Sequence, residues 1–219
     1  MKLILLGPPG AGKGTQCKRI IDRYGMTHLS SGDILRAERA AGSELGRKAQ
    51  AYMDAGALAP DDLIIAMMIG AIKKAGGGYV LDGFPRTVAQ AEALDAALAR
   101  AGERIDGIVN LVIDDEIIMR RLTGRRSCPK CGAVYHVENL KPKVKGVCDK
   151  DGAKLVQRDD DKTDVVAHRL KTYHKQTAAV VGYYEGAGKE IITIDAAESP
   201  DEVTASIFAE LDALNDQVG

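Results

Sequence analysis

The sequence predicts an α/β fold in which helices cover both faces of a parallel sheet and one small module is inserted. Short apolar runs alternate along the chain with segments of helical spacing, as in repeated strand–helix–strand units. Residues 125–161 break this alternation, because they show no helical period and contain Cys, Gly, Pro and Lys residues. We therefore expect a core formed by residues 1–124 and 162–219, with residues 125–161 as the inserted module.

The first half of the chain begins with a strand and is then mostly helical. Residues 2–6 form an apolar run closed by Gly7-Pro8-Pro9-Gly10, as expected for a buried strand that enters a turn. Residues 13–24 follow with apolar side chains at helical spacing. Further helices are expected over residues 33–41, 44–55 and 61–74. Pro60-Asp61 is a good start signal for the last of them.

The second half returns to the strand–helix alternation. Residues 79–82, three apolar side chains followed by Asp82, predict a second strand that Gly83-Phe84-Pro85 ends. Residues 87–100 form an Ala-rich helical segment. The run 107–113, apolar except for Asn110, predicts a buried third strand. The remaining elements are expected to be helices over residues 115–122, 162–184 and 200–214 and a strand over residues 191–194.

Composition excludes several classes of protein. The chain has 219 residues, of which 45% are hydrophobic and 28% charged, so it is neither wholly disordered nor collagen-like. Aromatic residues are 4% with no Trp, and the net charge is -1. These values argue against a stacking platform for single-stranded nucleic acid and against a global basic field. The longest apolar run, residues 63–72, is too short for a bilayer span.

The start of the chain has no core of a signal peptide, because residues 1–6 run directly into a glycine-rich turn. We therefore expect a cytoplasmic protein that neither binds nor crosses a membrane. In that compartment Cys17, Cys128, Cys131 and Cys148 are expected to be free thiols or metal ligands. Cys17, one turn into the first helix, is expected to be a buried apolar side chain.

The segment from Gly7 to Thr15, GPPGAGKGT, lies between a predicted strand and a predicted helix, which is the context of a phosphate-binding loop. Glycines let backbone N–H groups converge on a phosphate, and the helix N-terminus adds partial positive charge. Lys13 supplies a mobile charge for the β- and γ-phosphates. Gly14 stands where the general pattern has Ser or Thr, and Thr15 follows one position later. The loop alone therefore does not establish the usual contact of a hydroxyl with magnesium.

Further motifs make the chain resemble the adenylate kinases, in the bacterial form with a long lid. They stand in the family's order over essentially the whole length: Ser30–Arg36 (SSGDILR), Asp82–Arg86 (DGFPR), Gly124-Arg125-Arg126, Arg158-Asp159-Asp160 and His168-Arg169-Leu170. The sequence GKGT is this family's own version of the loop. The resemblance implies the P-loop nucleoside monophosphate kinase fold. It also implies reversible phosphoryl transfer from MgATP to AMP, which gives two ADP.

The resemblance assigns an ATP side to the site. Arginine suits phosphates because its planar, permanently protonated guanidinium offers bidentate donors. Arg121 is expected to pack on the ATP adenine, and Ala196 to contact the base through its backbone, at a position where the family often has Gly. The expected ATP-binding residues are Gly10, Ala11, Gly12, Lys13, Gly14, Thr15, Arg121, Arg125 and Ala196.

The resemblance also assigns an AMP side, within residues 30–59 and beyond. Arg36 and Arg86 are expected to grip the AMP phosphate, and Ser31 and Gln90 to contact the AMP base. The family often has Thr where Ser31 stands, and Ser keeps the hydroxyl. The expected AMP-binding residues are Ser31, Arg36, Ala57, Leu58, Ala59, Gly83, Arg86, Gln90, Arg158 and Arg169.

Catalysis is expected to need no general base, because an AMP phosphate oxygen is already ionised at neutral pH. Positioning and charge neutralisation remain as the task of the protein. Asp159 and Asp160 match acidic residues that order the arginines when the lid closes, and Asp82 matches the carboxylate that holds Mg²⁺ through water. Asp33 is expected to assist Asp82, although it could instead cap the following helix. The expected catalytic residues are Lys13, Arg86, Arg125, Arg158, Arg169, Asp159 and Asp160.

The inserted module carries a metal-ligand pattern. Cys128-Pro129-Lys130-Cys131 is followed by Cys148-Asp149-Lys150-Asp151, two knuckles that can place three thiolates and one carboxylate at tetrahedral corners. This donor set suits a structural Zn²⁺, although iron or cobalt could occupy it, and His136 is a rival fourth ligand. The resemblance is to the metal-bearing lid of some adenylate kinases, so Cys128, Cys131, Cys148 and Asp151 are the expected ligands.

Three alternative functions stay open at this point. A kinase for another nucleoside monophosphate would share the fold and the arginines. A zinc-ribbon protein that binds nucleic acid would fit the cysteines, although composition argues against it. A P-loop hydrolase would need a residue to orient water, and none is obvious. Residues 121–169 hold five more basic than acidic residues, as a cover for polyphosphate should. We expect ATP, AMP and ADP as partners, no nucleic acid, and a monomer.

Overall fold

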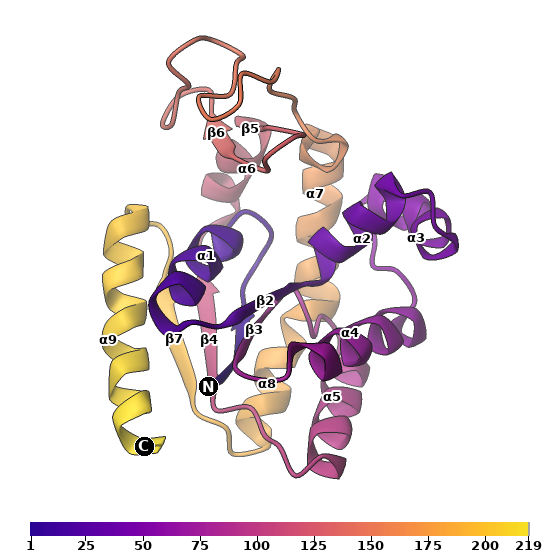
Figure 1. The fold of residues 1–219 in the computed structure, drawn as a ribbon, viewed down its shortest axis with the longest axis vertical. Coiled ribbons are helices and arrows are strands. Elements are labelled where there is room, and N and C mark those ends of the chain that lie inside the picture. Colours follow the sequence, from indigo (N-terminus) through magenta and orange to yellow (C-terminus); the bar gives the residue numbers. More distant parts are fainter. Residues whose placement is uncertain (219) are drawn as a thin grey trace.

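The computed structural model describes residues 1–218 and has an α/β architecture. The main sheet is parallel throughout, in the order β2-β3-β1-β4-β7. Its strands are β1 (Lys2–Leu6), β2 (Thr27–Ser30), β3 (Tyr79–Asp82), β4 (Gly107–Val112) and β7 (Ile191–Asp195). The predicted fold class is confirmed, with helices on both faces of this sheet (Figure 1).

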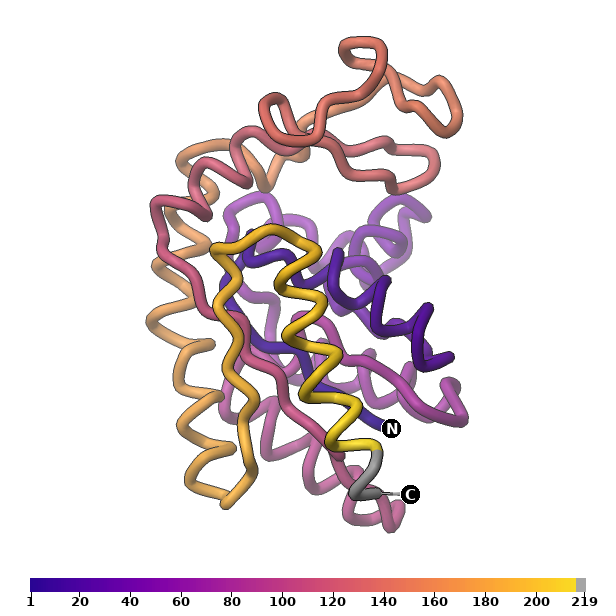
Figure 2. Tube along the Cα trace, turned by 90° about the vertical axis from the view of Figure 1, so that its left-hand side faces the viewer, coloured from indigo at the N-terminus to yellow at the C-terminus, as the bar shows by residue number. Residues whose placement is uncertain are grey.

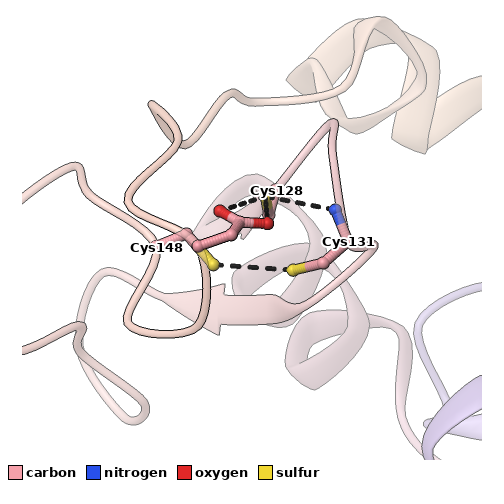
Figure 3. Close-up of side chains that lie close together, drawn as sticks. Cys128, Cys131 and Cys148 are labelled. Carbon is pink, nitrogen blue, oxygen red and sulfur yellow. Dashed lines mark hydrogen bonds between the residues drawn. The ribbon is translucent and has the colours of Figure 1, made fainter.

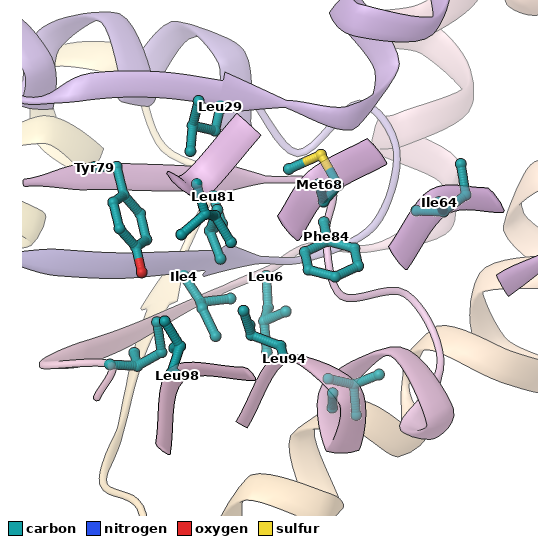
Figure 4. Close-up of a cluster of buried hydrophobic side chains, with 14 of the residues drawn as sticks. Ile4, Leu6, Leu29, Ile64, Met68, Tyr79, Leu81, Phe84, Leu94 and Leu98 are labelled. Carbon is teal, nitrogen blue, oxygen red and sulfur yellow. The ribbon is translucent and has the colours of Figure 1, made fainter. Parts of the chain in front are cut away.

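Alternate residues of β1 face two different hydrophobic clusters. Ile4 and Leu6 join the larger cluster, which packs under α4 (Asp61–Ala75), α5 (Val88–Arg100) and α8 (Ala179–Gly186). Figure 4 shows this cluster, with Met68 and Leu94 facing the sheet from two helices. Leu3 and Leu5 join the cluster on the opposite face, beneath α1 (Lys13–Tyr24) and α9 (Pro200–Val218). This alternation with period two is what fixes the sheet between two helix layers.

Strand β2 is an element that the sequence analysis did not predict. Its residues, Thr27-His28-Leu29-Ser30, include one apolar side chain, Leu29, and offer no apolar run. The strand lies at the edge of the sheet and pairs only with β3. An edge strand needs little apolar content, because only part of it is buried.

The helix expected over residues 162–184 is present, and a π-helical turn interrupts its α-helical hydrogen bonding. It consists of α7 (Thr163–Thr172), a π-helical turn (Tyr173–Thr177) and α8. Three further helices of the core are α2 (Ser31–Ala40), α3 (Glu44–Ala55) and α6 (Asp115–Thr123).

The inserted module projects beyond one end of the core (Figures 1 and 2). It contains the antiparallel pair β5 (Arg125–Ser127) and β6 (Val134–His136), followed by loops and a short 3-10 helix (Asp159–Asp161). Its own apolar cluster holds only four buried residues: Cys128, Tyr135, Cys148 and Leu155. A cluster of this size cannot hold a domain together without an additional staple. Within residues 1–218, no helix is long and apolar enough to cross a bilayer.

Candidate nucleotide site and lid metal centre

The glycine loop leaves β1 and leads directly into α1, as the phosphate-binding interpretation requires. Gly7 has a φ of 134°, and a Cβ there would lie 2.7 Å from the Leu111 carbonyl oxygen, so a side chain does not fit. Gly12 precedes α1 with a φ of 93° and has no side chain over the helix N-terminus. The first N–H groups of α1 are therefore accessible to an anion.

Lys13 folds back over this loop. Its Nζ donates hydrogen bonds to the carbonyl oxygens of Gly7, at 2.7 Å, and Pro8, at 2.8 Å. Burial lowers the pKa of Lys13 to about 8, although the neighbouring Asp82 carboxylate opposes this shift, and Arg86 and Arg169 add to it. A phosphate in the loop would supply the negative charge that this buried ammonium lacks.

Asp82 ends β3 beside the loop, at the carboxyl edge of the sheet where parallel α/β folds bind ligands. His28 Nε2 lies 3.2 Å from Asp82 Oδ2, and Cys17 belongs to the same group of ligand-type side chains. Cys17 is buried, as expected, and burial raises the pKa of its thiol well above the usual value. The His28 ring thus contacts Asp82 next to the phosphate loop.

Asp33 lies in the first turn of α2. It is not the helix cap, because Ser30 Oγ accepts the hydrogen bond from the Asp33 backbone N–H at 3.3 Å. The Asp33 carboxylate accepts a hydrogen bond from Arg36. Desolvation of the carboxylate works against this pair, but Arg36 outweighs it and lowers the pKa of Asp33.

The residues expected on the AMP side converge around the turn after β3. Ser31 Oγ donates to the Gly83 carbonyl oxygen at 2.5 Å, and Arg86 Nε donates to the same oxygen at 2.7 Å. Gln90 Oε1 accepts from the Arg86 backbone N–H at 2.8 Å. Residues 57–59 lie between α3 and α4, and Ala57 and Leu58 line a surface hollow. Ser31, Gly83, Arg86 and Gln90 thus form one hydrogen-bonded group, and residues 57–59 lie outside it.

The expected contact for the ATP base lies on the other side of the loop. Arg121, in the last turn of α6, donates from Nη1 to the Ala196 carbonyl oxygen at 2.7 Å. Its Nη2 donates to the Ala197 carbonyl oxygen at 3.1 Å. The guanidinium plane is thereby fixed against residues 196–197, and Ala196 itself is buried. A flat base can stack on a guanidinium held in this way.

Two aspartates of the 3-10 helix, Asp160 and Asp161, hold Arg125 of β5 and Arg169 of α7. Asp161 is 0% exposed and accepts two hydrogen bonds from Arg125, at 2.8 Å to Nε and 2.6 Å to Nη2. Asp160 pairs with Arg169 at 3.1 Å. Asp159 lies differently, because its 62% exposed side chain pairs with Lys162 at 3.1 Å. Asp161, which the sequence analysis did not single out, therefore holds Arg125, and Asp159 contacts none of the expected catalytic arginines within salt-bridge distance.

These cations lie close enough to disturb one another. Burial lowers the pKa of Arg158 to about 10, and Arg125 and Arg36 lower it further, while Asp160 and Asp161 oppose the shift. Burial likewise lowers the pKa of Arg169 and of Arg86. Arg158 finds one hydrogen bond in the lid, from its Nε to Ser127 Oγ at 3.0 Å. A cluster of partly buried cations that exceeds its counter-charges is a site for a polyanion.

The lid brings its three cysteines and one aspartate together. One ligand atom from each of Cys128, Cys131, Cys148 and Asp151 lies within 4.8 Å of all the others. Figure 3 shows the Cys131 and Cys148 sulfurs facing each other, 3.6 Å apart, with Cys128 beside them. Cys128 Sγ lies 3.3 Å from Asp151 Oδ2.

This geometry fits a tetrahedral metal ion. Zn–S bonds of about 2.3 Å at tetrahedral angles separate two sulfurs by about 3.8 Å. All three lid cysteines are free thiols, and Cys128 and Cys148 are buried. His136 lies outside this group, since its Nε2 is 3.2 Å from the Arg120 carbonyl oxygen. The predicted ligand set Cys₃Asp is therefore the one that the fold assembles.

Sequence comparison with known proteins gives one family for nearly the whole chain. The family model described as adenylate kinase matches residues 5–189 of the chain. The adenylate kinase of Lachnospira eligens is 49% identical over 209 residues, which are 94% of this chain and 98% of that protein. The adenylate kinase of Allorhizobium ampelinum is 48% identical over 217 residues, 98% of this chain and 100% of its own. That of Carboxydothermus hydrogenoformans is 49% identical over 209 residues, 94% of this chain and 97% of its own.

Proposed function

Because the chain belongs to the adenylate kinase family and is an ATP:AMP phosphotransferase, we propose that Lys13 and the clustered arginines perform the transfer by holding two nucleotides in line. The observation that carries this proposal is the convergence of Lys13, Arg86 and Arg169 next to Asp82 at the carboxyl edge of the sheet. Free in solution, the negative phosphates of ATP and AMP repel each other, so their alignment depends on such a cluster.

ATP is bound by the glycine loop and the end of α6. The N–H groups at the start of α1 and the Lys13 ammonium take the β- and γ-phosphates, for which Lys13 leaves its two carbonyl partners. The adenine stacks on Arg121, which residues 196–197 hold in place. Arg125, steadied by Asp161, approaches the phosphates from the lid.

AMP is bound on the opposite side of the transferred group. Arg36 and Arg86 take its phosphate, because both guanidinium groups lie near the turn after β3. Ser31, at the start of α2, and Gln90, in α5, contact its base beside the same turn. Residues 57–59 close around the nucleotide through their backbone, where Ala and Leu side chains serve as well as any others.

The chemical step is a displacement at the γ-phosphorus of ATP. An ionised oxygen of the AMP phosphate forms the new P–O bond as the bond to the β-phosphate oxygen breaks, so no proton has to be removed. Negative charge grows on the transferred oxygens and on the leaving ADP. Arg125, Arg158 and Arg169 neutralise that charge, and closure of the lid excludes water that would otherwise hydrolyse ATP.

Mg²⁺ enters with ATP and supplies charge neutralisation between the phosphates. Asp82, with Asp33 further along the same edge, is the residue suited to hold it through water, because Asp82 lies next to Lys13 and the loop. The lid metal is a structural Zn²⁺ held by three thiolates and Asp151, and it replaces the core that the lid is too small to form. We further propose that the protein works as a monomer in the cytoplasm, where these thiols stay reduced.

Two single variants test the assignment of sides. Arg36→Ala should raise the KM for AMP at least about tenfold and leave the KM for ATP unchanged, whereas Arg121→Ala should do the reverse. The measurement is initial velocity with each nucleotide varied at saturation of the other. An equal rise of both KM values in either variant would contradict the two-sided site.

A further inference from the structure

The side-chain amide of Gln90 is held at both ends. Its Nε2 donates to Asp61 Oδ1 at 2.7 Å, and its Oε1 accepts from the Arg86 backbone N–H at 2.8 Å. The second oxygen of Asp61 accepts from Thr87 Oγ1 at 2.9 Å. Thr87 Oγ1 in turn accepts from the Gln90 backbone N–H at 3.2 Å. Gln90 is 1% exposed, so water offers its amide no alternative partners.

The two anchors have fixed hydrogen-bonding roles. An ionised carboxylate can only accept, and a backbone N–H can only donate. If the Gln90 amide turned over, its NH₂ group would face the Arg86 N–H and its oxygen would face the Asp61 carboxylate. Both contacts would be repulsive, so the direction of the amide follows from its partners and not from the naming of its two terminal atoms.

Held in this direction, the amide would present a fixed pattern to a base once nucleotide binding uncovers this side chain. After its two anchors are counted, Gln90 keeps one N–H donor and one lone pair on Oε1. The adenine edge presents the N6 donor and the N1 acceptor, which matches this pair. Hypoxanthine presents O6 as an acceptor and N1–H as a donor, so it would need the amide reversed.

We infer that Asp61 is a positioning residue that makes the acceptor site select adenine, by locking the direction of the Gln90 amide. Asp61 does not itself touch the nucleotide in this account. The inference rests on the proposed contact of Gln90 with the AMP base. Asp61 opens α4 directly after the segment that closes around AMP, and α4 packs on α5, which carries Gln90.

The test compares AMP with IMP, two acceptors that differ only at this edge. The ratio of kcat/KM for AMP to kcat/KM for IMP is measured with MgATP for the wild type, Asp61→Ala, Asp61→Asn and Asp62→Ala. Asp62 is the matched control, since it lies in the same helical turn with the same charge but is exposed. KM for ATP and the melting temperature are recorded for each variant.

Asp61→Ala should lower the AMP/IMP ratio at least about tenfold, because one charged anchor of the amide is lost. Asp61→Asn should stay within about threefold of the wild type, because Asn can accept from Gln90 and donate to the Thr87 hydroxyl. Asp62→Ala should leave the ratio unchanged. A merely structural role of Asp61 would lower both kcat/KM values together and leave their ratio unchanged.

A wild-type ratio in Asp61→Ala would overturn the inference, as would an equal loss in Asp62→Ala. Gln90→Ala separates this failure from that of the proposed function. If Gln90→Ala also keeps the ratio, then Gln90 does not read the base, and the proposed AMP site is wrong at that residue. If Asp61→Ala fails to fold, Asp61→Glu replaces it, since the longer side chain displaces the carboxylate. An unchanged ratio in Asp61→Glu would then overturn the inference.

Discussion

Asp161→Asn is the substitution that most sharply tests how the lid arginines are held. The Asp161 side chain is 0% exposed and binds Arg125 through both oxygens, at 2.8 and 2.6 Å. Arg169 Nη1 also lies 3.7 Å from Asp161 Oδ1. The amide of Asn keeps the shape of the carboxylate but removes its charge. It also turns one of the two acceptors into a donor that faces a guanidinium.

The cost of this change can be estimated from the contacts. A hydrogen bond to a charged group contributes about 1.5–3 kcal/mol, and loss of one partner of a buried ion pair costs about 3–5 kcal/mol. The Arg125 side chain remains 21% exposed and can regain some hydration, which favours the lower figure. About 3 kcal/mol in a chain of this length lowers the melting temperature by roughly 6–12 °C. A displaced Arg125 should also lower kcat by roughly 10- to 100-fold.

Asp159→Asn is the matched control, because Asp159 is two residues away in the same 3-10 helix and pairs only with exposed or half-exposed basic groups. Its loss should cost less than about 1 kcal/mol. The assays are thermal unfolding by circular dichroism and kcat with both nucleotides saturating. If Asp161→Asn melted and turned over like Asp159→Asn, Asp161 would not be the residue that fixes Arg125, and the reasoning would be refuted.

Three further predictions concern the nucleotide site and the lid metal centre. Lys13→Ala and Arg125→Ala should each lower kcat at least about 100-fold in protein that still folds, and near-normal turnover in steady-state assays would contradict their roles. The number of protons taken up on ATP binding should increase as the pH is raised from about 7 to about 9. The lowered pKa of Lys13, about 8, leaves its amine partly neutral in the free protein, and the bound phosphates restore its proton. Calorimetry in buffers of different ionisation enthalpy measures this uptake, and Lys13→Arg should abolish it. Cys148→Ser should release the lid metal and lower the melting temperature more than it lowers activity at low temperature, as metal analysis and thermal unfolding can show. Unchanged metal content would contradict the structural role of the lid metal.

The sequence was most informative where chemistry depends on local spacing. The glycine loop and the two Cys knuckles are each formed within a few residues, and the structure assembles the predicted metal ligands within 4.8 Å. Strands with mainly apolar runs were predicted nearly to their ends. The boundaries of the lid, residues 125–161, stay a prediction.

Other features could not be read from local pattern. Strand β2 lacks an apolar run because it is an edge strand, so its pairing with β3 decides its conformation. Residues 159–161 are all aspartates, so the sequence does not distinguish them. The 3-10 turn decides which of their carboxylates face the arginines. Asp61 was predicted as the start of a helix, but its partner Gln90 lies 29 residues further along the chain. Long-range hydrogen bonds of this kind leave no spacing signal.

The measurement that tests the central claim most directly is ATP turnover across a panel of acceptors. MgATP is supplied with AMP, GMP, CMP, UMP or no acceptor, and ADP formation is followed with one purified sample of known metal content. Two nucleotides held in line by the Lys13 and arginine cluster, with the base read by Ser31 and Gln90, predict fast ADP formation with AMP and little with the other four conditions. Equal turnover with another nucleotide would contradict the base site, and turnover without an acceptor would contradict transfer under a lid that excludes water.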